Sequence, residues 1–63
     1  MRKDKYVVNF ILKDGYSDSF NCSSKRNVIK EIKALYAEFE VTDCSIRDIE
    51  KGVYYDSLMS FIY

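Results

Sequence analysis

The sequence predicts an α+β fold, a two-layer ββαββ arrangement in which one amphipathic helix packs on a small, mainly antiparallel sheet. The chain has two glycines and no proline, and Gly15 and Gly52 lie on either side of a single amphipathic stretch. Each glycine follows a charged residue and precedes an aromatic or β-branched residue, which is typical of a tight hairpin turn. We expect a single domain over residues 1–63, divided into a hairpin at about 5–22, a helix at about 24–40, a hairpin at about 43–56 and a tail at 57–63.

The first strand is predicted from alternation, because one parity of residues 6–13 is wholly apolar: Tyr6, Val8, Phe10 and Leu12. A two-residue turn at Asp14 and Gly15 would place Phe10 opposite Ser19. A three-residue turn that includes Lys13 pairs Val8 with Phe20 and Leu12 with Tyr16 instead. That register collects the apolar side chains of both strands on one face, so we expect it. It leaves Asp18 opposite Phe10, near an edge of the sheet.

The helix is predicted from the spacing of its apolar residues, which follows a period of about 3.6: Val28, Ile29, Ile32, Leu35, Tyr36 and Phe39. Ser23 and Ser24 precede it as capping residues. The helix is expected to cover the apolar face of the sheet, since neither element has another surface to bury against. Replacing Ile32 or Phe10 by alanine is expected to remove most of the net stability.

The second half of the chain is less regular. Residues 44–49 predict a third strand, Gly52 its turn, and residues from 53 to about 56 a fourth strand. The apolar tail from Leu58 continues as strand or folds back as a short helix capped by Asp56 or Ser57. Tyr54 and Tyr55 are adjacent, so in a strand they face opposite ways.

Composition argues against several classes of function. Histidine is absent, glycine-rich phosphate loops are absent, and Cys22 and Cys44 lack the C-x-x-C spacing of a zinc site. We therefore expect two small buried cysteines and a non-enzymatic chain without cofactor or metal. The charged start has no apolar run behind it, and no run approaches the roughly 20 residues that cross a bilayer. A cytoplasmic protein without membrane contact is expected.

Charge is unevenly distributed although the net charge is zero. Residues 1–33 carry eight Lys or Arg against four Asp or Glu, and residues 34–63 carry two against six. The two halves either form separate basic and acidic patches or interleave in space. The basic start of the helix is a candidate site for phosphate or nucleic acid, against the alternative of a solvated surface: Ser24, Lys25, Arg26, Lys30 and Lys33.

The outer face of the sheet is a second candidate, for protein binding. Val7, Asn9 and Ile11 lie on it, with one of Tyr54 and Tyr55, in a frame of polar side chains. Such a mixture is typical of protein interfaces, although single exposed apolar residues are also ordinary. A homodimer through this face would relieve the problem of a small core.

In size, in its content of lysine, isoleucine and tyrosine and in its lack of catalytic residues, the chain resembles accessory proteins of phages and mobile elements from AT-rich bacteria. Anti-CRISPR inhibitors are among these proteins. The resemblance covers the whole chain and rests on no diagnostic motif. It implies a small inhibitor that masks a host protein or nucleoprotein complex by competing for a basic nucleic-acid channel. The acidic candidates for this contact are Glu38, Glu40, Asp48 and Glu50, together with Asp43 and Asp56.

We therefore expect a protein-binding module. The alternatives are a nucleic-acid-binding protein, which the zero net charge disfavours, and a structural homo-oligomer subunit.

Overall fold

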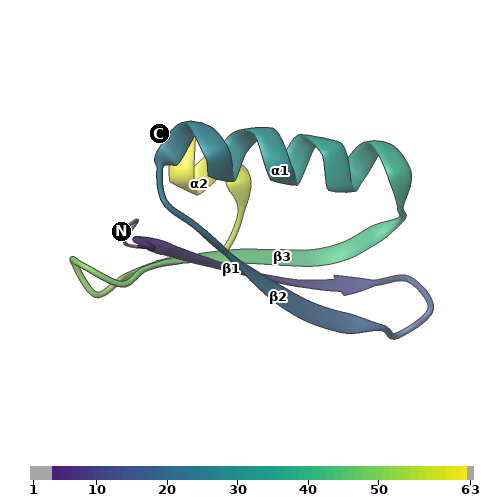
Figure 1. Cartoon of the computed structure of the whole chain (residues 1–63). Helices are drawn as coiled ribbons and strands as arrows, with labels where there is room; N and C mark the ends of the chain where they lie inside the picture. Colours follow the sequence, from purple (N-terminus) through teal and green to yellow (C-terminus); the bar gives the residue numbers. More distant parts are fainter. Residues whose placement is uncertain (1–3, 63) are drawn as a thin grey trace.

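Four antiparallel strands and two helices build the two layers of the computed structural model (Figure 1). The structure describes residues 4–62; residues 1–3 of the charged start and residue 63 of the tail lie outside that range. The elements are, in order, β1 (Tyr6–Leu12), β2 (Ser17–Cys22), α1 (Lys25–Glu38), β3 (Val41–Asp48), β4 (Val53–Tyr55) and α2 (Leu58–Ile62).

The strands form one sheet in the order β2-β1-β3-β4, so β1 and β3 are central and β2 and β4 are the edges. All three neighbouring pairs are antiparallel. The α+β class with a small antiparallel sheet is therefore confirmed. The element order ββαββα differs from the predicted ββαββ, because the tail folds into α2.

The first hairpin has the predicted register. Val8 pairs with Phe20, and the Leu12 N–H donates to the Tyr16 carbonyl at 2.7 Å across the three-residue turn. Gly15 adopts φ 95°, in the left-handed region where residues with a side chain are strained. The turn therefore sets which residues of both strands face the helix.

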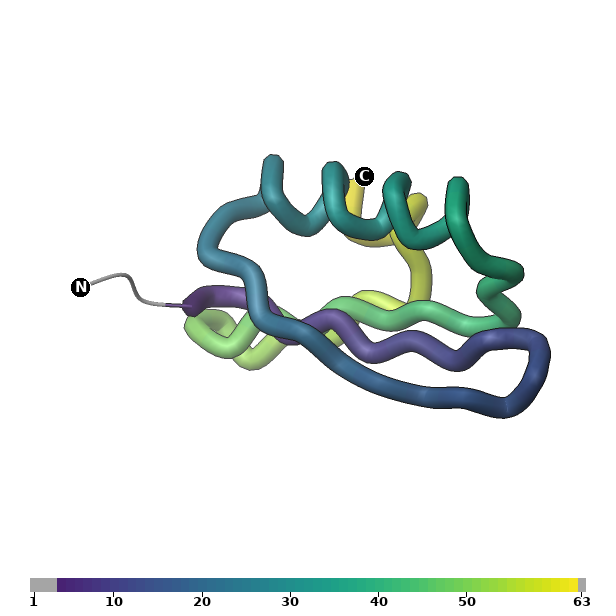
Figure 2. Tube along the Cα trace, turned by 45° about the vertical axis from the view of Figure 1, so that its right-hand side comes forward, coloured from purple at the N-terminus to yellow at the C-terminus, as the bar shows by residue number. Residues whose placement is uncertain are grey.

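The long helix α1 lies across one face of the sheet (Figure 2). It begins after Ser24, whose Oγ accepts the Asn27 N–H at 3.2 Å, and it ends at Glu38. Its own residues Val28 and Ile32 are fully buried. Two other predicted core residues of this helix region are not buried: the side chains of Tyr36 and Phe39 are 51% and 49% exposed.

The third strand begins at Val41, earlier than predicted, because the chain pairs with β1 immediately after the helix. The Lys13 N–H donates to the Glu40 carbonyl at 2.9 Å, and the Thr42 hydroxyl donates to the Ile11 carbonyl at 3.0 Å. The turn after β3 places Gly52 at φ 70°, as its turn role predicts.

The tail adopts the helical alternative and completes the core. Ser57 caps α2, since its Oγ accepts the Ser60 N–H at 3.1 Å. Phe61 on this helix is 5% exposed, and its ring meets those of Tyr6 and Tyr55 edge-on at 5.4 and 5.2 Å. The fully or nearly buried apolar residues are Val8, Cys22, Val28, Ile32, Cys44, Ile46 and Phe61.

Candidate protein-binding surfaces

The sheet face opposite α1 is uncovered by any described element, and it holds most of the predicted outer-face residues. Strand pairing aligns Val7 with Arg47, Asn9 with Ser45 and Ile11 with Asp43. Tyr54 joins this face beside Arg47 and is 64% exposed. The structure therefore brings four predicted residues together: Val7, Asn9, Ile11 and Tyr54.

Two predicted binding residues lie on the core side instead. Tyr55 pairs with Ile46 and packs against Phe61, because the alternation of β4 sends it to the face opposite Tyr54. Asp48 is 5% exposed; its Oδ1 accepts the Lys51 N–H at 2.9 Å and its carbonyl accepts the Gly52 N–H at 2.8 Å. The side chains of Tyr55 and Asp48 therefore pack in the core and hold the turn, away from the uncovered face; their predicted role in binding stays a prediction.

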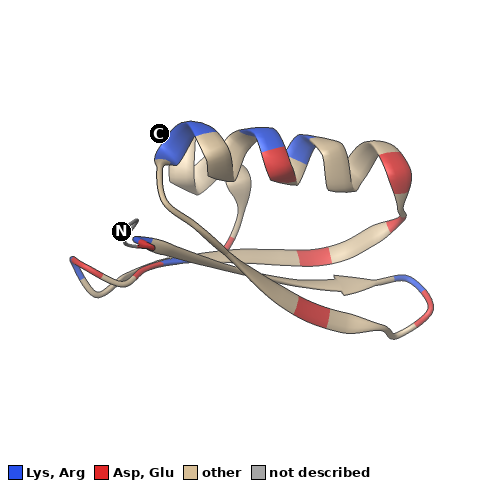
Figure 3. Ribbon diagram, viewed as in Figure 1, with Lys and Arg blue, Asp and Glu red and all other residues tan. Residues whose placement is uncertain are grey.

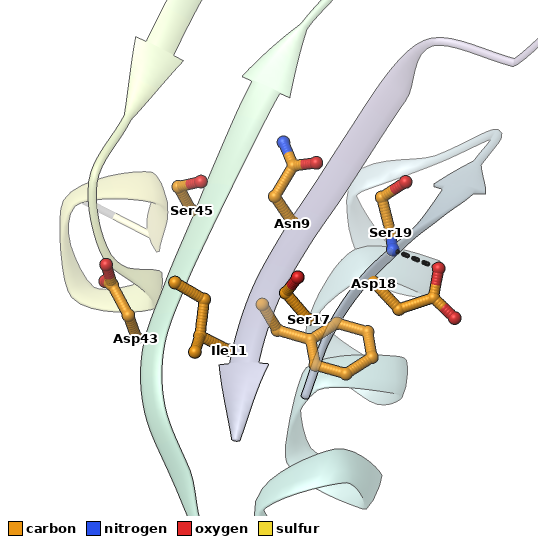
Figure 4. Close-up of a pocket in the computed structure, with 8 residues that line it drawn as sticks. Asn9, Ile11, Ser17, Asp18, Ser19, Asp43 and Ser45 are labelled. Atoms are coloured by element: carbon orange, nitrogen blue, oxygen red, sulfur yellow. Dashed lines mark hydrogen bonds between the residues drawn. The ribbon is translucent and has the colours of Figure 1, made fainter. Parts of the chain in front are cut away.

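Aspartates cap one amide on the edge strand β2 and one on the part of β3 that extends beyond β4. Antiparallel pairing alternates the direction of the backbone groups, so Ser19 and Cys44 direct their N–H groups away from β1. The Ser19 N–H donates to Asp18 Oδ1 at 2.7 Å (Figure 4), and the Cys44 N–H donates to Asp43 Oδ1 at 2.9 Å. β4 does not reach as far as Cys44, since its last pair is Tyr55 with Ile46. An added strand would have to displace these carboxylates, so the faces are better suited to binding than the edges.

Asp18 gives the edge a dependence on pH. The Ser19 N–H and then the Tyr16 hydroxyl, at 2.9 Å, hold the pKa of the Asp18 carboxyl below its usual range. A lowered folded-state pKa contributes stability above the unfolded pKa and loses it as the pH falls through the folded value. We expect Asp18→Asn to lack this part of the acid destabilisation when urea midpoints are measured from pH 7 to pH 2. The control Glu50→Gln should follow the wild-type profile; identical profiles for all three proteins would contradict the role of Asp18.

Positive charges gather in the first part of α1 and negative charges at its end, except for Glu31, which lies between Lys30 and Lys33. Lysine and arginine lie in its first three turns, whereas Glu38 and Glu40 lie at its other end, next to the β1–β2 turn (Figure 3). Glu40 pairs with Lys13, at 3.3 Å between Oε2 and Nζ. Glu50 lies apart from them, in the β3–β4 turn at the opposite end of the sheet. The predicted acidic residues therefore do not form one surface.

The basic start of α1 surrounds an apolar residue. A shallow hollow of about 530 Å³ is lined by Ile29 and by the four predicted cations: Lys25, Arg26, Lys30 and Lys33. Two of the predicted anion-binding groups already have partners in the chain. Ser24 Oγ accepts the Asn27 N–H, and Lys25 Nζ lies 5.4 Å from the centre of the Phe61 ring.

A groove that the sequence did not predict opens between α1 and the β1–β2 hairpin. The hairpin diverges from the helix toward its turn (Figures 1 and 2), and a hollow of about 400 Å³ remains between them. We call this hollow the open groove; its lining residues are Phe10, Phe20, Glu31, Ala34, Leu35, Glu38 and Phe39.

The floor of the open groove is apolar and its rim is acidic. The Phe10 and Phe20 rings lie 6.0 Å apart between centroids, and both are only half-buried. Glu31 and Glu38 stand two turns apart along the helix side of the groove. Asp18 is exposed and pairs with Phe10, on the sheet side. Phe39 also lines a neighbouring hollow with Leu12 and Glu40, so apolar surface continues toward the β1–β2 turn.

The two cysteines lie in the core and are free thiols. Burial, more than the neighbouring carboxylates, raises the pKa of both thiols, so they are protonated at neutral pH and weak nucleophiles. Among residues 4–62, no group of three or more His, Cys, Asp or Glu side chains could hold a metal ion. Within the same residues, neither helix has the length and hydropathy to cross a membrane.

Comparison with protein-family models, with curated proteins and with solved structures found no match to this chain.

Sequence reasoning missed Asp18 and Asp43 as edge caps and Phe39 and Phe20 as groove residues. A signal for the caps is present, since each aspartate directly precedes an edge residue whose amide lacks a strand partner. The groove has no such signal, because it depends on how far the hairpin turns away from the helix.

Proposed function

We propose that the chain is a non-enzymatic protein-binding module whose open groove receives a basic segment of a partner protein. The observation that carries this proposal is an apolar floor, solvent-accessible and rimmed by carboxylates. Half-exposed aromatic rings are the residues that most often anchor protein interfaces. A partner segment with one apolar side chain between lysines or arginines would match both the floor and the rim.

The distribution of charge supports this choice of partner. Glu31 and Glu38 line the groove, Asp18 pairs with Phe10 of its floor, and Lys13 in the β1–β2 turn is paired with Glu40. Carboxylates around a partly dehydrated apolar surface favour a basic partner and disfavour an acidic one. Nucleic acid, whose backbone is anionic, does not suit this surface.

An inhibitor of a host nucleic-acid-binding complex is the form of this function that we propose. Channels that hold nucleic acid are lined by lysine and arginine and often carry exposed aromatic or apolar contacts. A small acidic groove with apolar anchors competes for such a lining by the same two interactions. Glu38 and the neighbouring Glu40 are then the predicted acidic residues that take part, whereas Asp48 is buried and Glu50 lies in the β3–β4 turn, apart from the groove.

The proposal is tested by capturing proteins from a bacterial lysate with the tagged chain, with and without nuclease treatment. The captured proteins are identified by mass spectrometry. The groove variant combines Glu38→Lys with Phe39→Ser, both at the exposed end of the groove. We expect the wild type to retain a protein in stoichiometric amount and the groove variant to retain at least tenfold less. Thermal melting checks that both proteins are folded.

A matched control removes one carboxylate and one exposed apolar side chain elsewhere: Glu50→Lys with Met59→Ser. It should retain the same protein as the wild type. Equal retention by the groove variant, or the absence of any stoichiometric protein, would contradict the proposal. Retention that collapses on nuclease treatment would favour nucleic-acid binding through Lys25, Arg26, Lys30 and Lys33 instead.

A further inference from the structure

The side chains on the uncovered face of the sheet follow a pattern in which one end of the face complements the other. Its residues form three rows across the strands, taken from the observed pairing. The first row is Ser17, Ile11 and Asp43. The middle row is Ser19, Asn9 and Ser45. The third row is Asn21, Val7, Arg47 and, on β4, Tyr54, which has no counterpart in the first row because β4 ends at Tyr55.

The two outer rows are chemically complementary, strand by strand. β3 carries Asp43 in one row and Arg47 in the other, four residues apart on the same face. At a rise of about 3.4 Å per residue, these opposite charges stand roughly 14 Å apart, too far to pair within one chain. β1 carries an apolar side chain in each row, Ile11 and Val7, and the middle row is polar throughout.

We propose that this face binds a second copy of the chain, face to face. The two copies are related by a two-fold axis that runs across the strands at the level of the middle row. The strands of the second copy then run in the reverse direction, with β3 lying over β3 and the first row lying over the third. Asp43 of each copy then faces Arg47 of the other, and Ile11 faces Val7. Two ion pairs and two apolar contacts form from one self-complementary surface, which is what a closed two-fold dimer requires.

The shape of the face agrees with this arrangement. The first and middle rows border a shallow hollow of about 400 Å³, whose lining includes Ser17, Ser19 and Ser45 beside the larger Ile11 and Phe10 (Figure 4). The operation that pairs the charges places the long Arg47 side chain and Val7 of the second copy over this hollow. The small residues of one row therefore accommodate the large residues of the other.

Association through the face leaves the capped amides of the sheet undisturbed. Asp18 caps the Ser19 amide of β2 and Asp43 caps the Cys44 amide of β3, so strand addition at either amide would displace a carboxylate. Asp43 uses one carboxylate oxygen for this cap, which leaves the other for Arg47 of the second copy. The open groove lies on the helix side of the sheet, so the dimer and the proposed partner occupy different surfaces.

The test is sedimentation velocity of the untagged chain over a concentration series up to about 1 mM, a range that also detects weak association. We expect a reversible monomer–dimer equilibrium. Asp43→Arg and Arg47→Asp each place like charges opposite one another, and each should weaken self-association at least tenfold. Glu50→Arg, a charge change in the β3–β4 turn, should leave the equilibrium unchanged.

Mixing the two charge variants separates loss of the ion pairs from loss of folding. Asp43→Arg presents two arginines and Arg47→Asp two aspartates, so the mixture should form a heterodimer that neither variant forms alone. A wild-type chain that is monomeric throughout the series would overturn the inference, as would a mixture that stays monomeric. Either result would leave the lysate test of the open groove unaffected.

Discussion

Replacing Phe61 by alanine is expected to lower the free energy of unfolding by about 3–5 kcal/mol, the range for removal of a buried phenylalanine. Phe61 is 5% exposed, and its ring meets Tyr6 and Tyr55 edge-on while the Lys25 ammonium lies 5.4 Å from its centre. Small domains are stable by as little as about 5 kcal/mol, so the variant is expected to be largely unfolded near body temperature. Urea unfolding followed by circular dichroism measures the change.

The control for this experiment lies two residues earlier on the same helix. Met59 is 60% exposed, so Met59→Ala should change the unfolding free energy by no more than about 0.5 kcal/mol. Equal losses for the two variants would mean that α2 is not anchored by Phe61. An unchanged stability of Phe61→Ala would contradict its place in the core.

Ile32→Ala is the second large expected effect, at about 2–5 kcal/mol of unfolding free energy. Ile32 is fully buried at the middle of α1, where the helix presses on the sheet, and alanine would leave a cavity that the surrounding strands cannot close. Phe10, which the sequence ranks with Ile32, is half-buried beside the open groove. We therefore expect Phe10→Ala to cost less than Ile32→Ala, because water already reaches part of its ring.

The neighbouring exposed residue gives the comparison for Ile32. Lys33→Ala keeps a strong helix former at an exposed position, so its unfolding free energy should stay within about 0.5 kcal/mol of the wild type. Chemical unfolding of the three variants under one set of conditions ranks them. A loss for Phe10→Ala larger than that for Ile32→Ala would contradict the open groove.

The elements that local patterns specify strongly were predictable. The first hairpin follows from the strict alternation of apolar residues and from Gly15, which adopts the left-handed conformation that the turn needs. The helix follows from its apolar spacing and from Ser24 at its start. Each of these depends on residues close together in the sequence, where the chemistry of a turn or cap decides the outcome.

The parts that the sequence left open or did not reveal depend on contacts between distant residues. The tail from Leu58 is apolar at almost every position, so it fits a strand and a helix equally until the space beside α1 selects the helix. A charged residue such as Asp48 is expected at the surface. It is buried because its carboxylate accepts a hydrogen bond from the Lys51 N–H in the turn. The open groove depends on the twist of the hairpin, which no local pattern encodes.

The central place of β1 has a consequence for the order of folding. β1 meets β2 through a three-residue turn, but it meets β3 only across the whole of α1, and distant pairings of this kind limit the rate at which small domains fold. Phe61 contacts Tyr6 of β1 and Tyr55 of β4, two strands separated by β3. We therefore expect α2 to dock last, after the slow pairing of β1 with β3, and to stabilise a sheet that has already formed.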